Sequence, residues 1–165
     1  DQLPHHLTSL MMYGHGLLIP IPDIDHTDFM LILGGNPLAS NGSIMTVPDV
    51  EKRLKALQAR GGKLVVVDPR RSETAAIADQ HLFVRPGEDA ALLFGMLNTL
   101  FDEELTRASH LPVADLDELR AAVKPFTAEA MGPRCGVLAA QIRPIASLRW
   151  YFSRRSCGSA TRPSS

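Results

Sequence analysis

The stretch LVVVDPRRSETAAIADQHLFVRPGEDAALL, residues 64–93, decides the predicted fold. It opens with the apolar run Leu64–Val67, which is typical of a strand that is buried on both faces of a parallel sheet. That run ends at Asp68-Pro69-Arg70, and a shorter strand predicted over residues 81–84 ends at Arg85-Pro86-Gly87-Glu88-Asp89. Polar loops therefore follow two neighbouring strands, and open α/β sheets bind their ligands at such carboxyl ends.

Upstream of this stretch, residues 28–33 form a second continuous apolar run, which stops at Gly34-Gly35-Asn36-Pro37. Residues 48–60 carry apolar side chains at helical spacing, and Gly61-Gly62 is a typical helix stop. The order strand, helix, strand with short links predicts a βαβ unit with a right-handed crossover. The expected fold class is α/β, a Rossmann-like parallel sheet with flanking helices.

Further helices are expected on both sides of this unit: a short one near residues 7–13, a helical turn over 74–79, longer ones over 89–105 and 115–124, and one that begins at 138 but contains Pro144. Three regions follow from this. Residues 1–27 are an irregular segment that continues a missing upstream region, 28–129 are the α/β region, and 130–165 are a divergent, poorly ordered basic tail.

Composition narrows the class of protein. The formal net charge of −1 argues against a dedicated nucleic-acid binder. No apolar run approaches the length of a membrane span, and no signal peptide is visible, so a cytoplasmic location is expected. The two cysteines form no C-x-x-C pair, which predicts neither a zinc ribbon nor an iron–sulfur site in this chain.

The charges are unevenly distributed along the chain. All 18 acidic residues lie at or before Glu129, and only arginines supply charge after it. The chain also begins at Asp1 without a methionine. These features, together with the loss of helical periodicity after Ser147, predict a fragment or a frameshifted gene product rather than a whole protein. A basic tail that binds a partner is the alternative.

The first polar strand end combines Gly34 and Gly35 with Asn36. Glycines allow a ligand to approach the backbone closely, and the Asn amide offers both donors and an acceptor, so a phosphate or ribose would fit there. A tight turn before a crossover explains the same residues equally well. The G-x-G-x-x-G fingerprint of dinucleotide-binding sheets is absent.

The other two strand ends carry carboxylates. Asp68 stands where dinucleotide sites hold ribose hydroxyls, and Arg70 could pair with a phosphate. Alternatively, Asp68 caps a turn and Arg70 is solvated. Gly87 and Asp89 precede a predicted helix, so Asp89 could be a plain helix cap. Its carboxylate could instead accept the N1–H and N2–H₂ groups of a guanine.

Three segments together resemble the molybdopterin oxidoreductase family, which includes formate dehydrogenases, nitrate reductases and dimethyl sulfoxide reductase. They are DFMLILGGNP (28–37), GGKLVVVDPRRSETAAIAD (61–79) and HLFVRPGEDAALL (81–93). The resemblance extends over roughly residues 1–142, where GVLAAQIR (136–143) is similar to the start of a family helix.

The resemblance implies a part of a catalytic subunit that performs two-electron or oxo-transfer chemistry at molybdenum. This region would bind the guanosine diphosphate part of a molybdopterin guanine dinucleotide. Gly34, Gly35 and Asn36 would line the diphosphate, Asp68 and Arg70 the ribose, and Gly87 and Asp89 the guanine. The family's molybdenum ligand, and any iron–sulfur cysteines, would lie upstream, so the chain alone is expected to be inactive.

Two other functions remain open: a non-catalytic α/β module that binds a simple nucleotide, and the central domain of a thiamine-diphosphate enzyme.

Four smaller features receive structural interpretations. The sequence predicts surface positions for His5-His6, a polar loop for Asp23-Ile24-Asp25-His26, core packing for Met11-Met12, and an inert thiol for Cys135.

Overall fold

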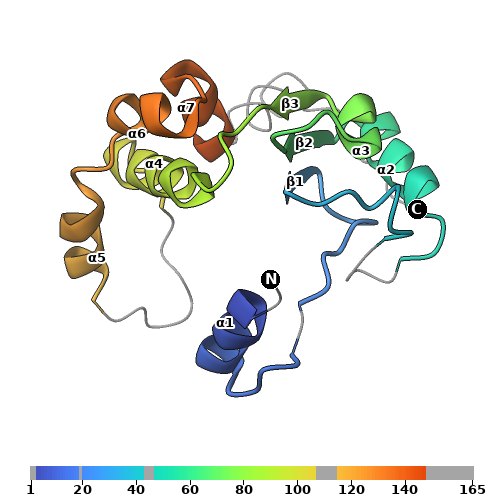
Figure 1. Ribbon diagram of the computed structural model, residues 1–165, viewed down its shortest axis with the longest axis horizontal. Coiled ribbons are helices and arrows are strands. Elements are labelled where there is room, and N and C mark those ends of the chain that lie inside the picture. The colour runs from blue at the N-terminus through green and yellow to red at the C-terminus, as the bar shows by residue number, and fades with distance from the viewer. Residues whose placement is uncertain (1–2, 19, 43–46, 107–114, 148–165) are drawn as a thin grey trace, which may run out of the picture.

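The computed structural model describes residues 3–18, 20–42, 47–106 and 115–147. Its elements follow the order α1 (Leu3–Tyr13), β1 (Phe29–Leu33), α2 (Val50–Ala59), β2 (Lys63–Val67), α3 (Glu73–Ile77), β3 (Gln80–Leu82), α4 (Asp89–Asp102), α5 (Leu116–Val123), α6 (Ala128–Cys135) and α7 (Ala139–Ser147). The strands form one parallel sheet in the order β1-β2-β3 (Figure 1). The predicted α/β class and its parallel sheet are confirmed.

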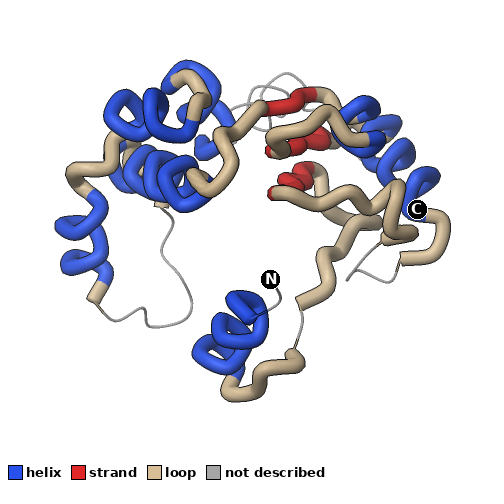
Figure 2. Tube along the Cα trace, in the orientation of Figure 1, coloured by secondary structure: helices blue, strands red, loops and turns tan. Residues whose placement is uncertain are grey.

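Helices cover both faces of the sheet (Figure 2). Side chains alternate along β2, so that Leu64 and Val66 pack with α2 on one face, whereas Val65 and Val67 pack on the other face with α4, α6 and α7. Successive residues of a strand point to opposite faces. The uninterrupted apolar sequence of β2 is therefore explained by a core on each side of it.

Helices α6 and α7 correct the expected boundary at residue 130. Thr127 caps α6 by accepting a hydrogen bond from the Ala130 N–H, and Gly136, at φ +78°, ends it. Pro133 and Pro144 lie inside these helices, but Met131, Cys135, Ile142 and Ile145 are buried in the core. Residues 130–147 therefore belong to the α/β body, because tertiary packing outweighs the local cost of a proline. The rest of the predicted tail, 148–165, lies outside the described residues.

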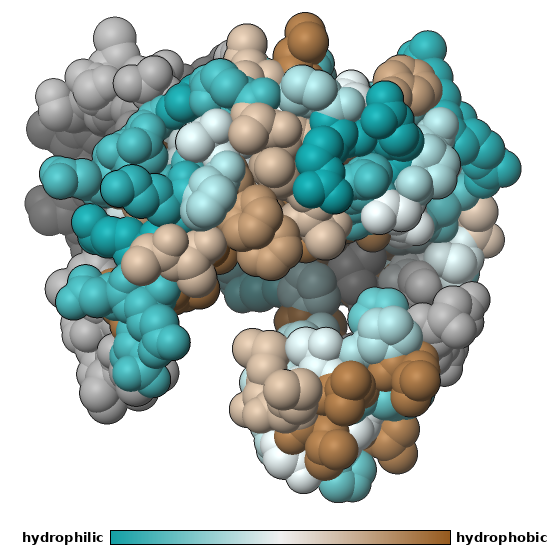
Figure 3. Space-filling view, turned by 60° about the vertical axis from the view of Figure 1, so that its left-hand side comes forward, coloured by the Kyte–Doolittle hydropathy of each residue, from teal (hydrophilic) through white to brown (hydrophobic). Residues whose placement is uncertain are grey.

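Helix α1 differs from the other helices because it packs little. It is longer than predicted, yet Ser9 is its only buried residue. Leu3, Leu7, Met11 and Met12 are all more than half exposed. The predicted core packing of Met11 and Met12 is therefore wrong. Figure 3 shows brown, hydrophobic patches on the lower lobe, and a hollow between this lobe and the body above it. None of the described helices combines the length and apolarity that a membrane span requires.

Candidate functional site

Backbone hydrogen bonds align the three polar loops at the carboxyl edge of the sheet. The Gly34 N–H donates to the Val67 carbonyl over 2.8 Å, and the Asp68 N–H donates to the Leu82 carbonyl over 3.0 Å. Each bond joins the residue after one strand to the end of the next strand. The loops after β1, β2 and β3 therefore lie side by side, as expected for the ligand-binding edge of a parallel sheet.

A cavity of about 740 Å³ opens at this edge, between the body and α1. Gly34 and Leu33 form its wall at the end of β1, and Asp89 and Leu93 form its wall on α4. The opposite wall comes from α1 and the residues after it: Pro4, His5, His6, Thr8, Ser9, Met12, Tyr13, Gly16 and Pro20. Two of the seven predicted site residues, Gly34 and Asp89, thus meet in one cavity.

The three predicted site glycines differ in their surroundings. Gly34 and Gly87 have φ values of +63° and +82°, which side-chain-bearing residues rarely adopt, and a Cβ on either would meet open space. Gly35 is tighter, because a Cβ there would lie 3.0 Å from the Ile32 side chain. A positive φ thus accounts for glycine at the turn positions 34 and 87, and Gly34 also leaves space in the cavity wall.

The Asn36 side chain is bound to α3 and does not line the cavity. Its Nδ2 donates to a Glu73 carboxylate oxygen over 2.6 Å, and its Oδ1 accepts hydrogen bonds from the Thr74 N–H and hydroxyl. This hydrogen bond from Asn36 lowers the pKa of Glu73. Asn36 therefore fixes the loop after β1 to the helix after β2, a structural role that sequence pattern alone did not separate from phosphate binding.

Asp68 and Arg70 also lie outside the cavity wall. Asp68 is buried, and its Oδ1 accepts a hydrogen bond from the Arg70 N–H over 2.7 Å, which closes a short turn. The Asp68 carbonyl lies 2.9 Å from His81 Nε2. The Arg70 side chain is exposed. The alternative of a turn cap and a solvated arginine describes these contacts, and the ribose contact predicted for this pair stays a prediction.

The loop that carries Gly87 and Asp89 is fixed by the end of α6. The Arg85 N–H donates to the Cys135 carbonyl over 2.7 Å, and its guanidinium donates to the Pro133 and Arg134 carbonyls. Free carbonyls at a helix end are natural partners for an arginine. A helix that the sequence did not predict thus positions the candidate carboxylate Asp89 at the start of α4.

His5 and His6 line the cavity, and His5 is exposed, in agreement with the predicted surface position, whereas His6 is partly buried. His6 Nδ1 lies 2.7 Å from the Gly16 carbonyl, which holds the ring in place. Their neighbours in the wall come from chain segments far away in sequence, so no local pattern could reveal the site. Adjacent histidines near a predicted helix were the only available signal.

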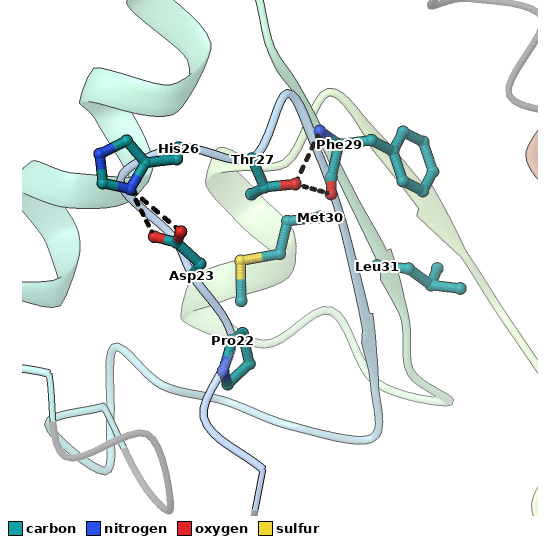
Figure 4. Close-up of a pocket in the computed structure, with 7 residues that line it drawn as sticks. All are labelled: Pro22, Asp23, His26, Thr27, Phe29, Met30 and Leu31. Carbon is teal, nitrogen blue, oxygen red and sulfur yellow. Dashed lines mark hydrogen bonds and ion pairs between the residues drawn. The ribbon is translucent and has the colours of Figure 1, made fainter. Parts of the chain in front are cut away.

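A second cavity, of about 510 Å³, runs beside β1 and contains Asp23, His26, Thr27 and Met30 (Figure 4). His26 Nδ1 lies 2.9 Å from the Asp23 carboxylate, and this contact lowers the pKa of Asp23. Asp25 forms an ion pair with Arg53 instead. These contacts agree with the predicted polar loop, and none of the described residues form a cluster of three potential metal ligands.

Cys135, the last residue of α6, is fully buried in the core that includes Val65 and Val67 of β2. Its sulfur contacts only backbone carbonyls among its described polar neighbours, those of Gly132 and Val137 at 3.7 and 4.0 Å. A thiol that is sealed in an apolar core is unreactive. The predicted inert role of Cys135 agrees with this environment.

Comparison with known proteins identifies relatives of this arrangement. The sequence model of the family described as "Molybdopterin oxidoreductase" matches residues 6–162, farther than the resemblance seen in the sequence alone. The chain is 33% identical to formate dehydrogenase H of Escherichia coli over 82% of its length, and 38% identical to the assimilatory nitrate reductase catalytic subunit of Bacillus subtilis over 54%.

Solved structures include a similar one, titled acetylene hydratase from Pelobacter acetylenicus. It superimposes with a TM-score of 0.67 and 29% identity over 78% of this chain. The chain covers only 17% of that protein, 18% of the formate dehydrogenase and 12% of the nitrate reductase. The similarity therefore concerns one region of much longer proteins.

Proposed function

Because the chain belongs to the molybdopterin oxidoreductase family, we propose that it is part of the catalytic subunit of a molybdenum-dependent oxidoreductase. Its carboxyl sheet edge holds the guanosine end of a molybdopterin guanine dinucleotide. When bound, the molybdenum–pterin group supplies the two-electron or oxo-transfer chemistry. The residues of this chain bind and orient the nucleotide end of that group.

The observation that carries this proposal is the cavity that Gly34 and Asp89 share. Its volume of about 740 Å³ lies within the usual range for small-molecule sites. Gly34 leaves room for a ligand beside the backbone, and Asp89 offers an exposed carboxylate at the start of α4. These residues fit a nucleotide, and they do so at the sheet edge where α/β folds bind one.

Asp89 provides selectivity for guanine in this proposal. A carboxylate accepts hydrogen bonds only, and guanine presents two donors side by side, N1–H and N2–H₂. Adenine presents an acceptor, N1, beside its amino group, so the same carboxylate would face a lone pair. Further residues complete the nucleotide's surroundings: Gly35 after β1, Asp68 and Arg70 after β2, and Gly87 after β3.

Calorimetric titration of the full chain with GDP and with ADP tests this function. GDP should bind more tightly, and Asp89→Asn should weaken GDP binding about 10-fold to 100-fold, the loss of hydrogen bonds to a charged acceptor. Asp117→Asn is the matched control, because Asp117 is also an exposed acid in the first turn of a helix, away from the cavity. It should leave GDP affinity unchanged.

Equal affinity for GDP and ADP would overturn the guanine assignment. So would an Asp89→Asn variant that binds GDP as tightly as the wild type. A chain that is folded by circular dichroism but binds neither nucleotide would show that this region does not form the site by itself.

A further inference from the structure

From the free edge of β1, we infer that the sheet takes a further parallel strand, supplied by a part of the catalytic subunit that lies outside this chain. This inference rests on the proposed function and deepens it, because the added strand would complete the same ligand-binding edge. The described sheet has the order β1-β2-β3, so β1 and β3 form its two edges. Of these two, β1 has the features of a strand that another strand covers.

The backbone of β1 offers hydrogen-bonding groups on its outer side. Along a strand, successive residues direct their N–H and C=O groups to opposite sides. The Gly34 N–H donates to the Val67 carbonyl, so Gly34 and every second residue before it face β2. Leu31 and Leu33 therefore face outward, and none of the described strands pairs with them on that side.

The Thr27 hydroxyl marks where this free stretch begins. It donates to the Phe29 carbonyl over 2.8 Å and accepts a hydrogen bond from the Phe29 N–H over 3.3 Å. Figure 4 shows these bonds beside the cavity of about 510 Å³, which also contains Leu31. The first outward residue of β1 is thus already satisfied, and a further strand would bond to Leu31 and Leu33.

One face of β1 is only partly covered. Met30 and Ile32 are buried on the face that α2 covers. On the other face Phe29 and Leu31 are only partly buried, and Leu33 is 41% exposed. Parallel sheets have both faces covered, because a crossover helix accompanies each added strand. A unit of one strand and one helix would therefore pair with the edge and cover these side chains.

The two edges of the sheet differ in their protection. Proteins shield an exposed edge with charges, prolines, bulges or a very short strand. Strand β3 is only three residues long, which is one such protection. Strand β1 has five residues, its sequence FMLIL contains neither a charge nor a proline, and its register with β2 has no bulge. An edge of this kind is suited to pairing with another strand.

The remainder of the subunit is the partner that fits this edge. The chain covers only 18% of formate dehydrogenase H and 17% of the acetylene hydratase, so most of each protein lies outside the matching region. A second copy of this chain fits less well. In Figure 1, α1 lies on the same side of the sheet as β1, and it faces the end of β1 across a cavity. An extended segment is more easily accommodated there than a whole molecule.

The added strand would also account for the position of the candidate site. Open α/β sheets bind their ligands at the point where the strand order reverses. The order β1-β2-β3 contains no reversal, yet the cavity with Gly34 lies at the end of β1. A strand on the outer side of β1 creates the reversal at this point, and the loop after it would join the ligand-binding edge.

Overlapping synthetic peptides test this inference. They span the part of Escherichia coli formate dehydrogenase H that lies outside the 138 matched residues. We expect the full wild-type chain to bind at least one of them, measured by fluorescence anisotropy. Amide hydrogen exchange, followed by NMR, should then slow at least about 10-fold at Leu31 and Leu33, which gain strand partners. The amides of Met30 and Ile32 already face β2 and should not change.

The variant Leu31→Pro removes one outward N–H from β1. An edge strand tolerates proline where its N–H points away from the sheet, so unchanged amide protection over residues 63–67 should show that the sheet is intact. Peptide affinity should fall by at least about 10-fold, because a carbonyl of the added strand loses its donor. Met11→Lys is the control, since Met11 is 78% exposed on α1, another apolar surface open to a peptide. It should leave peptide affinity unchanged.

Four results would overturn the inference. Slow exchange at Leu31 and Leu33 in the chain without peptide would show that the edge is already covered. The others are failure of every peptide to bind, loss of binding in Met11→Lys but not in Leu31→Pro, and a dimer of the chain that Leu31→Pro abolishes, which would identify a second copy as the partner.

GDP titration separates this inference from the proposed nucleotide site. If the chain binds GDP but none of the peptides, the inference fails and the nucleotide site stands. If a peptide binds at β1 but GDP does not bind with or without it, the nucleotide site fails and the strand assignment stands.

Discussion

The Thr74 hydroxyl joins helix α3 to the loop after β1. It donates to Asn36 Oδ1 over 2.8 Å and accepts a hydrogen bond from the Leu38 N–H over 3.2 Å, and Thr74 is fully buried. The variant Thr74→Val keeps the shape but leaves both partners one bond short. We expect the free energy of unfolding, measured in urea, to fall by about 1–3 kcal/mol.

Thr99 provides a matched control for this prediction. It is equally buried, but among the described residues its hydroxyl bonds only to the Gly95 carbonyl of its own helix. Thr99→Val should therefore change the free energy of unfolding by less than about 1 kcal/mol. An equal fall in the free energy of unfolding in the two variants would contradict this prediction. It would mean that the bond between Thr74 and Asn36 stabilises the fold no more than any other buried hydroxyl does.

Individual residues show where sequence reasoning reaches its limit. The positions of Gly34 and Asp89 at strand ends were predictable, because apolar runs and the βαβ order place the loops at one edge. The role of Asn36 was not, since Glu73 and Thr74 approach it only when two strands pair. The same holds for His5 and His6, whose partners in the cavity come from β1 and α4.

At the scale of elements, Arg143 of α7 forms ion pairs with α6 and with the end of α4. Its guanidinium bonds both carboxylate oxygens of Glu129 at 3.0 Å and one oxygen of Glu103 at 3.2 Å. The pKa of Glu129 is lowered by a hydrogen bond from its own backbone and then by the Arg143 guanidinium. The pKa of Arg143 is raised in turn, first by Glu129.

This network predicts a pH-dependent stability. The pKa of Glu129 is lower in the folded state than in the unfolded state, so the unfolded state binds more protons in acid. The stabilisation is therefore fully present above the ordinary carboxyl pKa of 4.5, and it is lost as the pH falls through the pKa of the folded state. The urea midpoint of the wild type should exceed that of Arg143→Met at neutral pH, and the gap should close by about pH 3.

Lys52→Met is the control, since Lys52 is exposed on α2 and forms no ion pair with the described residues. Its difference from the wild type should not vary with pH. A gap between Arg143→Met and the wild type that stays constant from neutral pH to about pH 3 would contradict a role for the ionised carboxylates.

The elements themselves were predictable to different degrees. The sheet strands and α2 follow from continuous apolar runs and a clear helical stripe. Helix α6 has a weaker signal, since its sequence AEAMGPRC contains both glycine and proline. Packing decides its structure: a Cβ on Gly95 of α4 would lie 3.3 Å from Met131, so the two helices meet where α4 has no side chain.

At the scale of the molecule, the body and α1 should differ in stability. Strand β2 is buried on both faces, whereas α1 has no extensive packing contact with another described helix or strand. Amide hydrogen exchange, read by mass spectrometry, should therefore be much faster in residues 3–13 than in residues 63–67. Equal protection of both segments would show that α1 is held more firmly than its contacts indicate.

The relatives share this region although their names denote different substrates: formate, nitrate and acetylene. The chain covers a fifth or less of each of these proteins. A region that is shared by proteins with such different substrates is not expected to select the substrate. We therefore expect the choice of substrate to depend on residues outside this chain.

The cavity between α1 and the body has a kinetic consequence. Helix α1 could move away from the body without disturbing either core, because it has no extensive contact with another described helix or strand, and the cavity that it lines would then open. A ligand bound in the cavity would add contacts between α1 and the body. The rate of ligand binding and release would then depend on the motion of this one helix.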